Sequence, residues 1–214
     1  MEHFRFFDPG RITRGWRQSL PHLEQREICY FVTFMTRDAI PKAAREKWAQ
    51  RRDVWLMQHG LPPGLDRTEI MERLPPAELI RFQRMLSSTY QRTMDKGSGE
   101  CPLRRADLRA IVEQAMTHHA DHTCLMGDFV IMPNHVHVLM QPRAEQTLKE
   151  ILGSIRKYSA REINKILQRK GPFWAKEPFD HMVRSARHFR RYQQYIRANP
   201  ARAKLASGMY TLSP

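Results

Sequence analysis

Two short apolar runs separated by a tight turn constrain the fold of this chain most. Residues 123–131 and 135–140, "TCLMGDFVI" and "HVHVLM", have the composition of buried strands, and Pro133–Asn134 between them predict a turn. We therefore expect an antiparallel hairpin. Side chains two residues apart on a strand share a face. His135 and His137 must then project side by side from one side of the second strand.

The remaining patterns place further elements around this hairpin. A strand is predicted at 28–36, a short extended piece at 178–183, and helices at 41–60, 75–94, 104–120, 147–171 and 186–198, the last ended by Pro200. Thr147 and Glu150 form a capping-box pattern at the start of the longest helix. We predict one domain over 1–214, with a helical insertion at 41–104 and a basic C-terminal segment at 172–214.

With the insertion set aside, the order of elements is β-α-β-β-α-β. This order predicts an α+β fold of the ferredoxin-like kind, with an antiparallel sheet. Helices would cover one face of this sheet, and the other face would stay open for a ligand.

The charge of the chain favours a nucleic acid as partner. The formal net charge is +14, from 36 Lys and Arg against 22 Asp and Glu. Residues 151–214 hold 14 of these cations and only 3 acidic residues, which gives a net charge of +11. A field of this sign suits phosphate backbones. No apolar run has the length of a membrane-spanning helix or of a signal peptide, so a membrane partner is not expected.

The cysteine pattern points to a reducing compartment. The chain has 3 cysteines, widely spaced and without a CxxC pair, which argues against a disulfide framework and against a cysteine zinc site. We expect a cytoplasmic protein associated with the nucleoid.

The long helix at 147–171 offers a chemical use for the two histidines. It carries Tyr158, and Glu162 four residues later shares its face. If this helix packs beside the two strands, His135, His137 and Glu162 can hold one divalent ion next to Tyr158. A phenol with a pKa near 10 is a poor nucleophile at neutral pH. A divalent ion would polarise a scissile phosphate, and the product would be a covalent phosphotyrosine.

Plainer interpretations stand beside this one. The histidine pair can be incidental, and Tyr158 can be an ordinary half-buried helix residue. His119 and His122 near a helix end are a second possible metal pair, but no nearby residue offers a third ligand in a rigid frame.

Three segments resemble one protein family. "VIMPNHVHVLMQP" resembles the HUH motif of single-tyrosine transposases, and "IRKYSAREINKIL" is similar to the tyrosine helix of REP-associated tyrosine transposases. The segment 171–205 resembles that group's C-terminal block, a W-x-x-x-x-F-D-H followed by an R-Y-I-x-x-N-P-x-x-A ending. "LPHLEQREICYFVTFMTRDAIPK" and "GSGEC" resemble an extended subgroup with a helical insertion. Together the resemblance covers about residues 20–206.

The resemblance implies a function and roles for particular residues. The protein would cleave and rejoin single-stranded or hairpin DNA at repeated extragenic palindromes through a covalent 5′-phosphotyrosine, as a monomer or homodimer. It implies His135 and His137 as metal ligands, Tyr158 as nucleophile and Glu162 as third ligand. A carboxylate at that third position favours Mg²⁺ or Mn²⁺.

The DNA-binding surface is predicted from cations near Tyr158 and in the tail. The residues expected to contact DNA are Arg156, Lys157, Arg161, Lys165, Arg184, Arg187, Arg190, Arg191 and Tyr192. By contrast, Tyr195 and Ile196 are expected in the buried stripe of the last helix.

Three alternatives remain open at this point. The first is a DNA-hairpin-binding architectural or regulatory protein of the same fold that has lost catalysis. The second is an HUH enzyme of replication initiation or plasmid transfer, and the third is a basic RNA-binding protein with incidental histidines.

Overall fold

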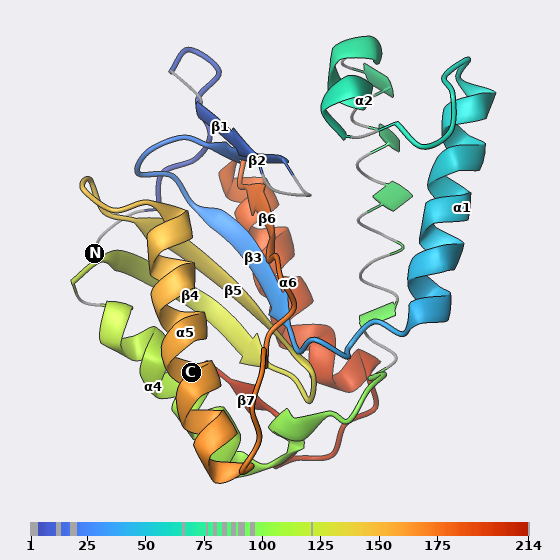
Figure 1. Cartoon of the computed structure of the whole chain (residues 1–214). Helices are drawn as coiled ribbons and strands as arrows, with labels where there is room; N and C mark the ends of the chain where they lie inside the picture. Colours follow the sequence, from blue (N-terminus) through green and yellow to red (C-terminus); the bar gives the residue numbers. More distant parts are fainter. Residues whose placement is uncertain are drawn as a thin grey trace.

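A five-stranded antiparallel sheet forms the centre of the protein, with the strand order β6-β3-β5-β4-β7. The computed structural model describes residues 4–11, 14–17, 21–65, 67–75, 77–78, 81–82, 85–86, 89, 93–94, 97–120 and 122–213. The strands of the sheet are β3 (Tyr30–Met35), β4 (Cys124–Ile131), β5 (His135–Pro142), β6 (Phe179–Met182) and β7 (Thr211–Leu212). Figure 1 shows the sheet with its helices.

The predicted hairpin forms and supplies the middle of this sheet. β5 pairs with β4 on one side and with β3 on the other, where His137 lies opposite Thr33 and His135 opposite Met35. The Met132 amide donates to the His135 carbonyl at 2.8 Å and closes the turn. The strands β3, β4, β5 and β6 have the ferredoxin-like order, so the predicted α+β class is confirmed.

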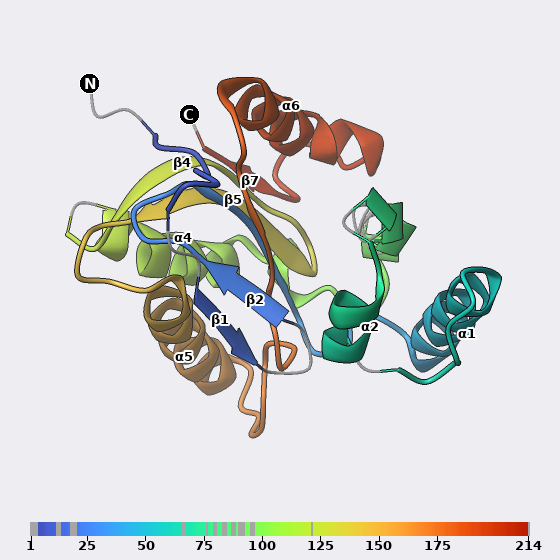
Figure 2. The same cartoon turned by 90° about the horizontal axis from the view of Figure 1, so that it is seen from above.

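Helices cover both faces of the sheet. On one face lie α4 (Ala106–Ala120) and α5 (Leu148–Ile166), whose apolar residues pack against Val136 and Val138. On the other face lies α6 (Ala186–Arg202), whose Ile196 packs against Phe31 and Leu139. Figure 2 shows α6 on one side of the sheet and α4 and α5 on the opposite side. The face that the sequence left open for a ligand is therefore covered by α6.

The start of α5 is as predicted, whereas the ends of α5 and α6 differ from the prediction. Thr147 caps α5, and the capping box with Glu150 is complete, as predicted. However, α5 ends at Ile166 rather than at 171, and α6 continues through Pro200 to Arg202. A proline in the last turn removes only one backbone donor, so the helix can continue for a few residues beyond it.

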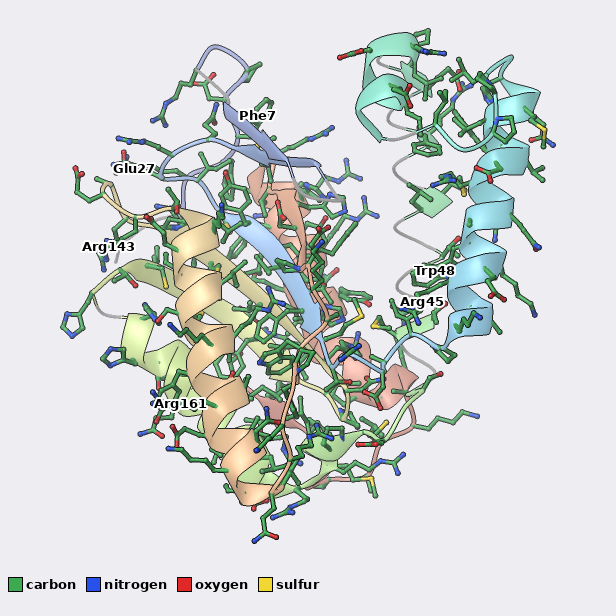
Figure 3. The ribbon with its side chains drawn as sticks, in the orientation of Figure 1. Phe7, Glu27, Arg45, Trp48, Arg143 and Arg161 are labelled. Atoms are coloured by element: carbon green, nitrogen blue, oxygen red, sulfur yellow. The ribbon has the colours of Figure 1, made fainter. Side chains whose placement is uncertain are left out.

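The helical insertion stands apart from the sheet. It contains α1 (Lys42–Gln58) and α2 (Arg67–Arg73), and Figure 3 labels Arg45 and Trp48 on α1. α1 was predicted, whereas α2 was not. The helix predicted at 75–94 lies partly outside the described residues. A short 3-10 turn, η1 (Pro102–Arg104), leads from the insertion into α4.

The N-terminal segment adds a small hairpin that the sequence did not indicate. Its strands β1 (Arg14–Arg17) and β2 (Pro21–Glu24) pair antiparallel with each other. In the described part of the chain, no helix combines the length and apolar character that crossing a membrane requires.

Candidate functional site

The two histidines lie under α6, in the middle of the sheet. His135 and His137 are 1% and 0% exposed, and the His137 ring stacks on Phe31 with centroids 5.3 Å apart. Burial lowers the pKa of His135 to about 3. Burial, followed by the nearby His135 and Arg202, also lowers the pKa of His137 well below its ordinary value. Both rings are therefore neutral at pH 7, and a neutral imidazole is the form that binds a metal ion.

The hydrogen bonds of Asn134 fix the protonation of the His135 ring. The Asn134 Nδ2 donates to the Ser98 carbonyl at 2.7 Å, so its Oδ1 is the atom that faces His135 Nδ1, also at 2.7 Å. An amide oxygen can only accept, and the proton of this neutral ring must therefore sit on Nδ1. The Nε2 lone pair of His135 is buried and has no hydrogen-bond partner among the described residues. It is thus available as a ligand.

His137 connects the sheet to a tyrosine on α6. Its Nδ1 lies 2.7 Å from the Thr33 hydroxyl oxygen, and its Nε2 lies 3.4 Å from the Tyr195 hydroxyl oxygen. When Nδ1 donates to Thr33, the Nε2 lone pair faces Tyr195. The second histidine then presents the same ring nitrogen as the first.

Tyr195 is held among aromatic rings and beside a cation. Its ring contacts His137 with centroids 5.1 Å apart and meets Phe31 edge-on at 5.9 Å. The guanidinium carbon of Arg202 lies 5.2 Å from the Tyr195 ring centroid. A cation at this place favours negative charge on the phenol or on a phosphate beside it.

Asn199 lies one helical turn after Tyr195 and has the same unusual property as His135. It is 0% exposed, and both atoms of its amide lack a hydrogen-bond partner among the described residues. A buried polar group without a partner costs about 1–3 kcal/mol. Such a cost is a common mark of a site whose ligand supplies the missing contact.

The direction of α6 relative to β5 places Asn199 toward His135. Tyr192 stacks on Phe31 with centroids 4.1 Å apart, and Tyr195 contacts His137. The helix thus advances along β5 toward the start of that strand. A helical turn advances about 5.4 Å, and two strand residues span about 6.6 Å. The turn after Tyr195 therefore meets the strand near His135.

A carboxylate on β4 anchors α6 on both sides of Tyr195. Asp128 accepts from Gln193 Nε2 at 2.7 Å and forms an ion pair with Arg197 Nε at 2.7 Å. The β4–β5 register shifts by one residue between Met126 and Phe129, as in a β-bulge, and Asp128 lies in this stretch. Bulges often redirect a side chain next to a functional site. Here the bulge lies beside the two contacts that fix the rotation of α6.

The structure does not bring Tyr158 and Glu162 to the histidines. Both lie on α5, whose Ile155 and Ile163 pack on the opposite face of the sheet. Tyr158 is 36% exposed, and Glu162 forms ion pairs on the surface with Arg161 and Lys165 at 2.7 and 3.0 Å. These contacts lower the pKa of Glu162, first through Arg161. Within one chain, the four residues of the expected site therefore fall on two faces.

The cations expected to bind DNA also divide between the two faces. Lys157, Arg161 and Lys165 lie exposed along α5, and Figure 3 shows Arg161 at its outer side. Arg156 differs from them because its Nη2 donates to the Ala175 and Lys176 carbonyls.

The cations of the tail lie around the start of α6 and are exposed. They are Arg184, Arg187, Arg190 and Arg191. Tyr192, in contrast, is partly buried and stacks on Phe31, and this burial raises its pKa. Its ring is therefore used in packing.

Sequence reasoning missed Tyr195 and Asn199, although the signal was present. They have the same i, i+4 spacing as Tyr158 and Glu162, within "YIRANP". Ile196 is in the core as expected, whereas Tyr195 is half-buried with its hydroxyl at His137. No group of three or more His, Cys, Asp or Glu that could hold a metal occurs in the described part. The Asn199 side chain, an amide, is not one of these four residue types.

The other candidate histidine pair is not a metal site by its contacts. His119 Nδ1 lies 2.7 Å from the Thr123 hydroxyl and its Nε2 lies 3.0 Å from the Ser154 hydroxyl. Both ring nitrogens therefore take part in structural hydrogen bonds between α4, the following turn and α5.

One comparison with protein families matches a segment of the chain. Residues 103–199 match the model of a family described as "Transposase IS200 like". The matched segment includes both histidines, Tyr195 and Asn199. No curated protein sequence matches the chain.

Two solved structures are similar to the chain at low identity. One is a REP-associated tyrosine transposase bound to a REP hairpin, 13% identical, with a TM-score of 0.42 over 86% of this chain and 74% of that one. The other is a candidate transposase from Deinococcus radiodurans, 14% identical, with a TM-score of 0.34 over 82% of this chain and 93% of that one.

Proposed function

We propose that the chain, whose residues 103–199 match the model of a family described as "Transposase IS200 like", is a DNA strand transferase with Tyr195 as its nucleophile. Its substrate would be single-stranded or hairpin DNA, which it cleaves and rejoins with the help of a divalent ion. One observation carries the proposal: the Tyr195 hydroxyl lies 3.4 Å from His137 Nε2. His135 projects from the same side of β5, and α6 carries the buried Asn199 one turn after Tyr195. Tyr195 thus takes the role that the sequence suggested for Tyr158.

The residues of this face fit a divalent ion. His135 Nε2, His137 Nε2 and the Asn199 amide oxygen would be its ligands, and among the described residues the atoms of His135 and Asn199 have no hydrogen-bond partner. Imidazole nitrogen together with amide oxygen suits Mn²⁺ better than Mg²⁺, since Mg²⁺ prefers oxygen ligands. When bound, the ion would polarise the scissile phosphate and neutralise charge that develops on it.

The side chains of the protein supply nucleophile, charge and rigidity. The Tyr195 oxygen forms a bond to phosphorus while the bond from phosphorus to the 3′ oxygen breaks. The phenol proton passes to solvent, and the departing 3′ oxygen takes up a proton as a free hydroxyl. The reverse attack by a 3′ hydroxyl on the phosphotyrosine rejoins DNA without ATP. Arg202 beside the ring favours the charge that develops.

The distribution of cations suggests how DNA approaches. Arg184, Arg187, Arg190 and Arg191 surround the start of α6, the helix that carries the nucleophile. We propose that they hold the strand that enters the site. Lys157, Arg161 and Lys165 lie on α5 across the sheet, so they would contact a more distant part of a hairpin.

One chain contributes every residue of the proposed site. For this reason we expect the monomer to be active, with no need for a tyrosine from a second copy. A DNA strand transferase of this kind would act on the nucleoid in the cytoplasm.

The decisive experiment is a covalent-adduct assay. End-labelled hairpins from the host's intergenic repeats are incubated with wild type, Tyr195→Phe and Tyr158→Phe, with Mn²⁺, Mg²⁺ or chelator, and separated on denaturing gels. We expect an adduct with wild type and Tyr158→Phe that requires the metal, and none with Tyr195→Phe. An adduct that survives Tyr195→Phe and disappears in Tyr158→Phe would reverse the assignment.

Two further outcomes separate the alternatives. Tight binding of the hairpin without adduct under any ion would support an architectural protein of the same fold. Equal competition by an RNA hairpin of the same sequence would support the RNA-binding interpretation.

A further inference from the structure

We propose that Asn134 is a positioning residue that determines the tautomer of His135, and that the loop closing the helical insertion fixes the orientation of the Asn134 amide. We define this closing loop as residues 97–101. The inference rests on the proposed metal site. It gives the insertion a role in that site without any contact between the insertion helices and the ion.

Asn134 is held at three points, and its amide has one possible orientation. It is 0% exposed, and its backbone carbonyl accepts from the Thr36 amide at 2.8 Å. Its Nδ2 donates to the Ser98 carbonyl at 2.7 Å, and its Oδ1 accepts from His135 Nδ1 at 2.7 Å. A flipped amide would bring two acceptors together at Ser98 and, in the tautomer described, two donors together at His135.

The closing loop is itself fixed by backbone geometry that few residues adopt. Gly99 has φ +92°, and a Cβ at this position would lie 2.7 Å from Asp38 Oδ2. The Glu100 amide donates to the same Asp38 oxygen at 2.6 Å. Cys101 has a left-handed φ of 54°, and its thiol donates to the Gly97 carbonyl at 3.1 Å. The Ser98 carbonyl is therefore held at a fixed place next to the hairpin turn.

The consequence concerns which ring nitrogen of His135 is available. If the proton moved to Nε2, a buried donor would be left without a partner among the described residues, and the Nδ1 lone pair would face the Asn134 oxygen. Both changes are unfavourable, so the pair Ser98–Asn134 holds the Nε2 lone pair toward the ion site. Loss of such an outer hydrogen bond typically weakens metal binding about 10–100-fold.

The test uses metal binding and ring tautomer, without DNA. In the full-length protein, Mn²⁺ affinity is measured by calorimetry, and the His135 tautomer is read from ¹⁵N chemical shifts of labelled histidine in the metal-free protein. We expect Asn134→Leu to lose the fixed Nδ1–H tautomer and to bind Mn²⁺ about 10–100-fold more weakly. Asn134→Asp keeps an acceptor for His135 but loses the donor to the Ser98 carbonyl, so it should keep the Nδ1–H tautomer and bind Mn²⁺ more tightly than Asn134→Leu does.

Matched controls separate positioning from general damage. Asn164→Leu removes an amide that bridges the Gly171 carbonyl and Arg169 away from the site, and it should leave both readouts unchanged. Gly99→Ala should weaken Mn²⁺ binding through the collision with Asp38. Gly64 also has a positive φ of +79°, but no atom of the described residues lies within 4 Å of a Cβ added there, so Gly64→Ala should leave Mn²⁺ binding unchanged.

The outcomes distinguish this inference from the proposed function. If Asn134→Leu keeps both the tautomer and the Mn²⁺ affinity of wild type, the inference is overturned. It is also overturned if Asn134→Asp loses affinity as much as Asn134→Leu, because the effect would then be one of packing. If wild type binds no Mn²⁺, the proposed site fails, while the tautomer in the metal-free protein still decides the role of Asn134.

Discussion

Asn199→Leu should make the metal-free protein more stable while it removes metal binding. In the structure, both amide atoms of Asn199 are buried without a partner among the described residues. Leaving such a group unpaired costs about 1–3 kcal/mol, and leucine has the same branched arrangement of heavy atoms without polar atoms. We therefore expect the free energy of unfolding in chelator to rise by about 1–3 kcal/mol. For a chain of this size, that corresponds to about 2–12 °C in Tm.

The same variant should lose the stabilisation that the ion gives to wild type. A ligand at 100 times its Kd stabilises the folded state by about 2.7 kcal/mol. Wild type should therefore gain about this amount when Mn²⁺ replaces chelator, and Asn199→Leu should gain much less. Urea unfolding followed by circular dichroism gives the free energy of unfolding of wild type and of Asn199→Leu, each in chelator and in Mn²⁺.

The sign of the result in chelator tests the reasoning directly. A loss of more than about 1 kcal/mol in Asn199→Leu would mean that the amide has a stabilising partner in the folded protein. It could then not be an orphaned ligand. Asn164→Leu serves as control, because its amide is hydrogen-bonded at both ends and its replacement should destabilise the protein.

Three further predictions concern rigidity, pH and DNA affinity. Asp128→Ala removes the ion pair that holds Arg197 of α6, so Tyr195 should be less precisely positioned and adduct formation should slow about tenfold. Hairpin affinity should stay unchanged; single-turnover gels measure the rate and fluorescence anisotropy the affinity. In chelator, the free energy of unfolding should fall as pH drops below about 6.5, by about 1.4 kcal/mol per pH unit for each buried histidine. The reason is that His135 and His137 bind protons in the unfolded state, whereas burial lowers their pKa and keeps them neutral in the folded state. Denaturation midpoints between pH 7 and 5 check this, and a flat profile would contradict it. Arg187→Ala should lower the salt slope of binding to a single strand by about 0.7, since one phosphate contact is lost.

Local patterns were sufficient to predict the hairpin and most helices. The apolar runs at 123–131 and 135–140 and the Pro133–Asn134 turn act over a few residues, and β4 and β5 form where they were expected. The capping box of α5 is equally local. Such features depend on short-range sterics and hydrogen bonds, which a sequence displays directly.

The site could not be predicted in the same way because it depends on the face on which each helix packs. Tyr158 with Glu162 and Tyr195 with Asn199 have the same helical spacing, and the sequence offers no measure of which pair meets the histidines. A carboxylate also looks like the better ligand than an amide. The structure separates the pairs by burial, since Glu162 is neutralised at the surface by cations whereas Asn199 is enclosed. Tertiary packing, rather than residue type, makes this distinction.

The contact between Asp38 and the closing loop also determines how the insertion is joined to the rest of the protein. The chain leaves the body of the protein near Asp38 and re-enters it near Gly99. Asp38 lies against Gly99 and accepts a hydrogen bond from the Glu100 amide. Everything between them begins and ends at one point, so its length can change without stretching either anchor, and each doubling of a flexible loop costs only about 0.6 kcal/mol. The insertion should therefore be replaceable. A shorter or unrelated segment joined between Asp38 and Gly99 should leave the sheet, α6 and the hydrogen bond from His135 to Asn134 intact.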